Sequence, residues 1–176
     1  MSRVPTAAVL LIGNELLSGK VQDANLIVLA RELRALGVHL VRTVMVEDDE
    51  QVIARDLRVL ADSHDWVFTS GGVGPTHDDV TVAAVARAFG QSIVREPRLE
   101  SLLRGYYGAK LTDGLLRMAD VPERTELVFG VDEGDGHGRG DGHDPWPTIL
   151  VGNVFVLPGI PQVFQMKMAA VRRRLR

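Results

Sequence analysis

The chain has 176 residues, with 20 Lys and Arg against 23 Asp and Glu, a formal net charge of −3 and no cysteine. This length suits one domain, so we expect residues 1–176 to form a single domain. The charge gives no support to nucleic-acid binding, and the lack of cysteine excludes disulfides and thiolate metal sites. No apolar run approaches the ~20 residues that span a bilayer, and no leader pattern is present, so we expect a cytoplasmic protein without membrane contact.

The first half of the chain alternates strand and helix patterns. Ala7–Ile12 is continuously apolar, as in a strand buried on both faces of a parallel sheet. Strand patterns cover 7–12, 39–46 and 65–69, and helical patterns run from about residue 26 to Gly37, from Asp48 or Asp49 to about residue 61, and from Val80 to Gly90. This alternation predicts right-handed crossovers and a three-layer α/β/α fold with a mostly parallel sheet.

The second half of the chain carries weaker patterns. A short strand is predicted over 92–95, a helix over 97–107, a helical segment over 111–118, and a last helix after Pro161. The runs 148–151 and 154–157 flank Gly152 and Asn153 and predict a hairpin, which we expect in a small accessory region. The glycine-rich stretch 134–144 is expected to be a flexible surface loop. Its His137 and His143 are not expected to bind metal, because alternating glycines cannot orient ligands.

The most informative stretch follows the third predicted strand and reads Ser70-Gly71-Gly72-Val73-Gly74-Pro75-Thr76-His77-Asp78-Asp79-Val80-Thr81. A glycine-rich loop that leads into a helix is typical of a phosphate site, because its backbone N–H groups and the helix dipole favour an anion. Asp78 and Asp79 would repel a phosphate. A divalent cation would remove this conflict, and oxygen ligands suit magnesium or manganese.

Small, amide and acidic residues also follow the other predicted strands. They are Gly13, Asn14, Glu15, Asp23 and Asn25 after the first strand, Asp48 and Asp49 after the second, and Pro158 and Gly159 after the last. In open α/β sheets the ligand crevice lies outside the carboxyl ends of the strands. We therefore expect these segments and the glycine loop to meet at one ligand site.

Simpler interpretations remain open for several of these residues. Asp48 or Asp49 alone would suit the N-cap of the second helix, and Asp78, Asp79 or Thr81 would suit that of the third. Glu15 alone would suit the surface. Two nucleotide motifs are excluded: residues 13–20 have five residues between the glycines where a Walker loop has four, and the glycine loop lacks the third glycine of the dinucleotide fingerprint.

Five motifs in order resemble the molybdopterin-binding domain family, whose fold is that of MoaB and MogA. They are residues 13–19, 23–25, 46–49, 71–81 and 157–161. Within this family the chain is similar to the N-terminal domain of CinA, a competence/damage-inducible protein, and to the corresponding domain of eukaryotic-type FAD synthases. The chain has Asn14 where the family usually has Asp. It also lacks the family's Asn-Pro-x-Gly-x-Ala-Pro-Gly run, in whose place it has the glycine- and histidine-containing stretch.

The resemblance implies a homo-oligomer, a dimer or a trimer, that binds a nucleotide or a pterin. In relatives that make molybdenum cofactor, acidic residues matching Asp48 and Asp79 act with magnesium on molybdopterin. CinA-like relatives are associated with metal-dependent cleavage of ADP-ribose, and the FAD synthase domain with FAD hydrolysis. The resemblance therefore implies a metal-dependent nucleotide pyrophosphatase acting on ADP-ribose or FAD. A molybdopterin-binding protein and a non-enzymatic nucleotide-binding or assembly module are the alternatives.

Each expected site residue has a role in this hypothesis. Asp48, Asp78 and Asp79 would hold magnesium, manganese or cobalt, and Asp48, Asp79 and Glu15 would be catalytic, with Glu15 orienting the attacking water. The residues expected to bind phosphate or other parts of the ligand are Gly13, Asn14, Asp23, Asn25, Ser70, Gly71, Gly72, Val73, Gly74, Pro75, Thr76, Pro158 and Gly159.

Overall fold

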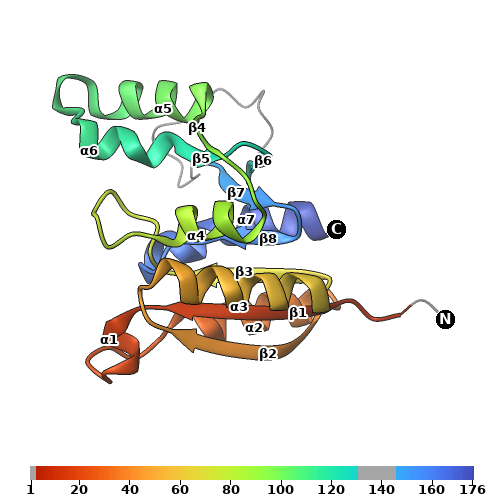
Figure 1. The fold of residues 1–176 in the computed structure, drawn as a ribbon. Helices are drawn as coiled ribbons and strands as arrows, with labels where there is room; N and C mark the ends of the chain where they lie inside the picture. The colour runs from red at the N-terminus through yellow and green to blue at the C-terminus, as the bar shows by residue number, and fades with distance from the viewer. Residues whose placement is uncertain (1–2, 131–145) are drawn as a thin grey trace.

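The computed structural model describes residues 3–130 and 146–176 (Figure 1). The predicted loop 134–144, with His137 and His143, lies outside these residues. The elements are β1 (Thr6–Ile12), α1 (Asn14–Leu17), α2 (Asn25–Ala35), β2 (His39–Val46), α3 (Glu50–Ser63), β3 (Trp66–Ser70), α4 (Thr81–Ala88), β4 (Ile93–Arg95), α5 (Pro97–Tyr107), η1 (Gly108–Lys110), α6 (Asp113–Leu116), η2 (Arg117–Ala119), β5 (Asp120–Pro122), β6 (Thr125–Val128), β7 (Thr148–Val151), β8 (Val154–Val156) and α7 (Pro161–Leu175).

Six strands form the central sheet in the order β2-β1-β3-β8-β7-β6. β1 pairs in parallel with β2 and with β3, and β3 pairs in parallel with β8. The other two pairs, β7 with β8 and β6 with β7, are antiparallel. The sheet is therefore mostly parallel, as predicted. The predicted hairpin of β7 and β8 forms, but its predicted place in a small accessory region is wrong: β8 pairs with β3, so the hairpin belongs to the main sheet.

Helices cover both faces of the sheet, and β1 shows why its sequence is continuously apolar. Ala7, Val9 and Leu11 pack into a core with α2 and α7, whereas Ala8, Leu10 and Ile12 pack into a second core with α3 and α4. Successive side chains of a strand point to opposite faces, so a strand buried on both faces has no polar position. The predicted three-layer α/β/α fold is confirmed.

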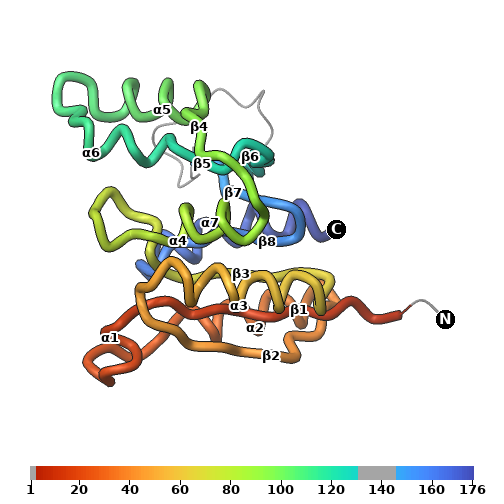
Figure 2. Tube along the Cα trace, viewed as in Figure 1, coloured from red at the N-terminus to blue at the C-terminus, as the bar shows by residue number. Residues whose placement is uncertain are grey.

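Residues 93–122 form a small unit beside the main sheet, visible at the top of Figure 1. β4 and β5 pair antiparallel as a separate two-stranded sheet, and Leu99 and Leu103 of α5 pack there against Ala119 and Val121. Figure 2 follows the trace from α4 into this unit and back through β5 to β6. The small unit is thus inserted between two elements of the main fold.

Most predicted elements agree with the structure to within one or two residues. β2 and α5 have the predicted bounds, and a short α6 with η2 replaces the single helical segment predicted over 111–118. α1, β5 and β6 were not predicted, because three or four residues are too few to show a period. Among the residues described, none of the helices has the length and apolar character needed to cross a bilayer.

Candidate functional site

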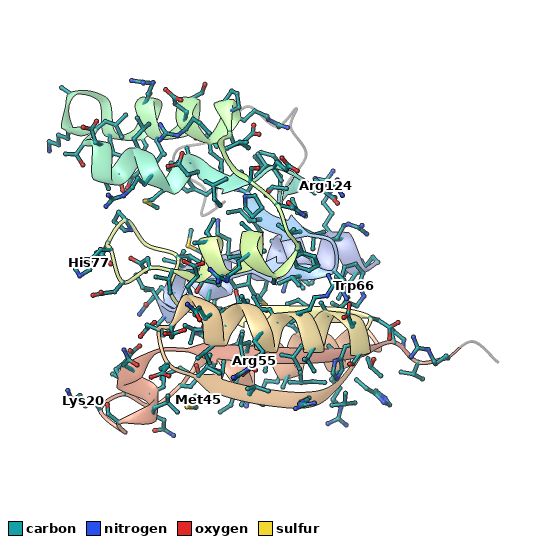
Figure 3. The ribbon with its side chains drawn as sticks, in the orientation of Figure 1. Lys20, Met45, Arg55, Trp66, His77 and Arg124 are labelled. Atoms are coloured by element: carbon teal, nitrogen blue, oxygen red, sulfur yellow. The ribbon has the colours of Figure 1, made fainter. Side chains whose placement is uncertain are left out.

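The loops after β1, β2, β3 and β8 line one cleft of about 1200 Å³ at the carboxyl edge of the parallel strands. Figure 3 shows Lys20, from the loop after β1, and His77, from the loop after β3, at the same end of the molecule. Both chain termini lie toward the opposite end (Figure 1). The cleft is therefore where the topology of an open α/β sheet places a ligand site.

The glycine loop after β3 requires its first two glycines. Gly71 has φ 113° and Gly72 has φ 64°, and a Cβ would collide with the backbone oxygen of Ile12 at Gly71 and with the Thr81 hydroxyl at Gly72. That hydroxyl donates to the Gly71 carbonyl at 2.8 Å, and the Thr81 N–H donates to the Gly72 carbonyl at 3.0 Å. The first residue of α4 thus holds the loop close to the end of β1.

Three successive N–H groups of this loop are available to a ligand. The backbone N–H groups of Gly72, Val73 and Gly74 donate to no acceptor within the part of the chain that the structure describes. All three residues line the cleft. Consecutive unpaired N–H groups form a concave site for anions, and a phosphate would supply the missing acceptors. The loop geometry therefore favours a phosphate at this point of the cleft.

The N-terminus of α7 contributes to the same cleft. Its N-cap residue, Ile160, makes no side-chain capping hydrogen bond, and Gly159, Ile160 and Val163 all line the cleft. The positive end of this 15-residue helix therefore adds to the attraction for an anion that the glycine loop already provides.

The carboxylate of Asp79 shapes the far end of the loop. Its Oδ2 accepts a hydrogen bond from the Thr76 N–H at 2.9 Å and another from the Thr76 hydroxyl at 2.5 Å. The N-cap of α4 is Val80, and it has no side-chain capping bond, so the alternative that Asp78, Asp79 or Thr81 caps this helix is wrong. Asp78 is exposed and pairs with His77 at 3.0 Å. Both carboxylates line the cleft.

Asp48 and Asp49 have different roles. Asp49 is the N-cap of α3, and its Oδ1 accepts from the N–H groups of Gln51 and Val52 at 2.8 and 2.9 Å. Asp48 Oδ2 instead accepts from the N–H of Asn14 at 2.8 Å, in the loop after the neighbouring strand. The capping interpretation therefore holds for Asp49, and Asp48 is left to line the cleft.

Glu15 and Asn25 occupy contrasting positions. Glu15 lies on α1 at the edge of the cleft, exposed, with its carboxylate close to Gly13. Asn25 is buried, and its Nδ2 donates to the Ser70 hydroxyl at 2.9 Å and to the Gly159 carbonyl at 2.8 Å. Asn25 therefore connects the start of α2 with the end of β3 and the loop after β8.

A family model described as "Probable molybdopterin binding domain" matches residues 8–176 of the chain. The chain belongs to this molybdopterin-binding domain family. A "Probable FAD synthase" of Caenorhabditis briggsae is 31% identical over 174 residues, which cover 89% of this chain and 32% of that protein. The chain thus spans about a third of the length of this curated relative.

Solved structures agree with the family assignment. The protein CinA from Thermoplasma acidophilum superposes with a TM-score of 0.83 at 28% identity, covering 99% of this chain and 100% of that one. MoaB from Thermus thermophilus, described as a molybdopterin biosynthesis enzyme, superposes with a TM-score of 0.57 at 20% identity, covering 95% and 89%. The second likeness shows the shared fold of the family.

The cleft of this family member contains many of the residues predicted from the sequence, but not all of them. The predicted residues that line it are Asn14, Glu15, Asp48, Gly71, Gly72, Val73, Gly74, Pro75, Asp78, Asp79, Pro158 and Gly159. Gly13, Asp23, Asn25, Ser70 and Thr76 are not among its lining residues. Asp23 accepts from the Leu26 N–H at 2.8 Å at the start of α2, and Ser70 is buried against Asn25.

The structure adds residues to the cleft that the sequence interpretation missed. Lys20 lines it beside the predicted loop after β1, and Tyr107 and Met118 reach it from the small unit. The position of Lys20 next to the predicted motif was a usable signal. Tyr107 and Met118 lie 26 or more residues beyond Thr81 in the sequence, and no pattern connected them with the site.

The predicted metal ligands line the cleft without forming a closed cage. No three His, Cys, Asp or Glu side chains gather closely enough to hold an ion in residues 3–130 and 146–176. The carboxylates of Asp48 and Asp79 already accept hydrogen bonds through one oxygen each. This donor set does not fit a site built from protein ligands alone. It fits magnesium held by one or two carboxylates together with ligand phosphates, which is how magnesium commonly binds.

Proposed function

We propose that this domain binds a nucleotide pyrophosphate in the cleft and hydrolyses it with the help of a divalent cation, with ADP-ribose and FAD as the candidate substrates. The observation that carries the proposal is the position of three N–H groups, from Gly72 to Gly74, that have no acceptor among the described residues and lie in the same cleft as Asp48 and Asp79. The likeness to CinA and to an FAD synthase supports a nucleotide ligand.

Different residues of the chain would bind the phosphates, hold the cation and orient the water. The N–H groups of the glycine loop and the N-terminus of α7 would bind the phosphates. Asp48 and Asp79 would hold magnesium or manganese, which when bound supplies stabilisation of phosphoryl charge and a more acidic water. Glu15, exposed at the cleft, would orient the attacking water as a hydrogen-bond acceptor.

A pterin ligand is the second candidate, and the family assignment favours it. The matching model is described by molybdopterin binding, and MoaB has the same fold. The same N–H groups would hold the phosphate of a pterin. In that case the domain would retain the pterin without cleaving a nucleotide.

One assay separates these candidates. Purified protein is incubated with ADP-ribose, FAD and molybdopterin, with and without magnesium, manganese or cobalt, and both binding and products are measured. Metal-dependent release of AMP from ADP-ribose or FAD supports the pyrophosphatase, and pterin retention without cleavage supports the alternative. If neither cleavage nor pterin retention is observed, the domain acts as an assembly module. Light scattering on the same preparation tests the proposed homo-oligomer.

The variant Asp79→Asn tests the mechanism. Asparagine keeps an acceptor for Thr76 but removes the charge, so we expect turnover to fall about 100-fold or more while the fold is retained. Asp49→Asn is the matched control, because Asp49 caps α3 outside the cleft lining. Metal-dependent AMP release by Asp79→Asn at the wild-type rate would exclude the role of Asp79.

A further inference from the structure

A second cavity, of about 600 Å³, adjoins the phosphate cleft. Val73, Gly74 and Asp79 of the glycine loop line both cavities, as do Tyr107 and Met118 of the small unit. The two cavities therefore meet at the loop that carries the unpaired N–H groups. A ligand with its phosphate on that loop would therefore lie beside the second cavity.

Aromatic side chains form one wall of this second cavity. Tyr106 contacts Tyr107 edge to face, with ring centroids 4.9 Å apart, and contacts Trp146 in the same way at 5.7 Å. Tyr106 is 64% exposed although it is large and apolar in part. Further apolar side chains complete the wall, among them Leu99, Leu103 and Ile149. Such a wall suits a flat ring system.

Polar contacts fix this wall and connect it with the glycine loop. Arg117 of the small unit donates from Nη2 to the Pro75 carbonyl at 3.0 Å. Lys167 of α7 is buried and donates from Nζ to the carbonyls of Trp146 and Pro147, at 2.8 and 3.3 Å. The backbone that carries Trp146 and the loop that would carry the phosphate are therefore both held by side chains lining the cavity.

We propose that this second cavity binds the fused heteroaromatic ring of the ligand whose phosphate lies on the glycine loop. The inference rests on the proposed function, since it takes the glycine loop as the phosphate site. It narrows the ligand to a phosphorylated compound that carries a flat ring, and excludes sugar phosphates without one. A mostly apolar cavity of about 600 Å³ falls within the size range of small-molecule sites.

The first test varies the aromatic wall and the ligand together. Tyr106 is well exposed, so Tyr106→Ala is expected to leave the fold intact, which its thermal unfolding checks. Binding of ADP-ribose and FAD should weaken about tenfold in this variant, since stacking of one base on an aromatic side chain contributes a factor of this order. Inorganic pyrophosphate, which has no ring, should bind the variant and the wild type equally. Tyr106→Phe keeps the ring and should retain wild-type affinity.

The second test detects the ring without its phosphate. The chain has two tryptophans, and Trp66 lies toward the end of the molecule away from His77 (Figure 3). A Trp66→Phe variant therefore reports on Trp146 alone. Adenosine, riboflavin and a free pterin should each be titrated against its fluorescence. The ring that quenches it at the lowest concentration identifies the source of the heteroaromatic group.

The outcomes separate the two proposals. If pyrophosphate and ADP-ribose bind but Tyr106→Ala changes neither affinity, the ring site is wrong and the phosphate site stands. If ring compounds quench Trp146 and pyrophosphate does not bind, the phosphate site is wrong and the ring site stands. If nothing binds the wild type, both are wrong.

Discussion

Asp48 and Asn14 exchange hydrogen bonds across the ends of neighbouring strands. Asp48 Oδ2 accepts from the Asn14 N–H at 2.8 Å, and Asn14 Oδ1 accepts from the Asp48 N–H at 3.4 Å. The two residues are 34 positions apart in the sequence, and parallel pairing of β1 with β2 brings them together. Asn14 therefore joins the segments after β1 and β2 through its backbone N–H and its uncharged side-chain amide.

The neighbours Asp48 and Asp49 should respond oppositely to substitution. Asp49→Ala removes the cap of α3 and should lower the free energy of unfolding by about 1 kcal/mol, with turnover retained. Asp48→Asn keeps an acceptor for Asn14 and should leave unfolding nearly unchanged while turnover is lost. Urea unfolding and AMP release, measured on both variants, check this. Equal loss of turnover in Asp48→Asn and Asp49→Ala would contradict the assignment of Asp49 as a helix cap and Asp48 as a cleft residue.

Gly72→Ala should abolish phosphate binding. The φ of 64° costs about 1–2 kcal/mol for alanine, and the new Cβ also displaces the Thr81 hydroxyl that holds the loop. Gly90→Ala is the control, because Gly90 has φ 62° but nothing within 4 Å of a new Cβ. Gly90→Ala should lower the free energy of unfolding only by the cost of its positive φ. It should bind pyrophosphate normally in calorimetry. Normal binding by Gly72→Ala would show that the loop conformation is not needed.

Asn25→Ala should lower both stability and ligand affinity. It leaves the Gly159 carbonyl and the Ser70 hydroxyl without their buried donor, at a cost of about 1–3 kcal/mol. Asn153 is a matched control, since its Nδ2 also donates to two carbonyls, those of Ala61 and His64, away from the cleft. The midpoint temperature of thermal unfolding should fall in both variants. The affinity for pyrophosphate should fall only in Asn25→Ala. The same affinity loss in Asn153→Ala would indicate a general effect of destabilisation.

Asp65 should make stability depend on pH in the acid range. Hydrogen bonds from the N–H and the hydroxyl of Thr6, at 2.7 and 3.0 Å, lower the pKa of Asp65 below its usual 3.8. A lowered folded-state pKa stabilises the fold above the unfolded-state pKa, and this contribution is lost as pH falls through the folded-state value. Asp65→Asn should therefore be less stable at pH 7, and its difference from wild type should shrink below about pH 4. Urea midpoints between pH 2 and 7 measure this.

A control for the pH experiment lies nearby in the sequence. Asp62 forms an exposed ion pair with Arg58 at 3.1 Å, and exposed pairs contribute little to stability. Asp62→Asn should therefore change the urea midpoint less than Asp65→Asn at pH 7. A larger effect of Asp62→Asn would contradict this ranking.

Local patterns were enough to predict the layers of the fold and the glycine-rich loop after β3. The continuous apolar run of β1 and the helical stripes after it depend on spacing within a few residues, and burial on one or two faces dictates that spacing. The glycines of the loop are likewise readable, because positive φ and close backbone contact select glycine locally.

The choice among the acidic residues depended on contacts between distant segments. Asp48 and Asp49 are equal as capping candidates in the sequence, and only the pairing of β1 with β2 gives Asp48 a partner in Asn14. The two hydrogen bonds of buried Asn25 likewise require the end of β3 and the loop after β8 to meet. The aromatic wall formed by Tyr106 and Trp146 joins residues 40 positions apart. Such contacts arise from chain topology, which no local period encodes.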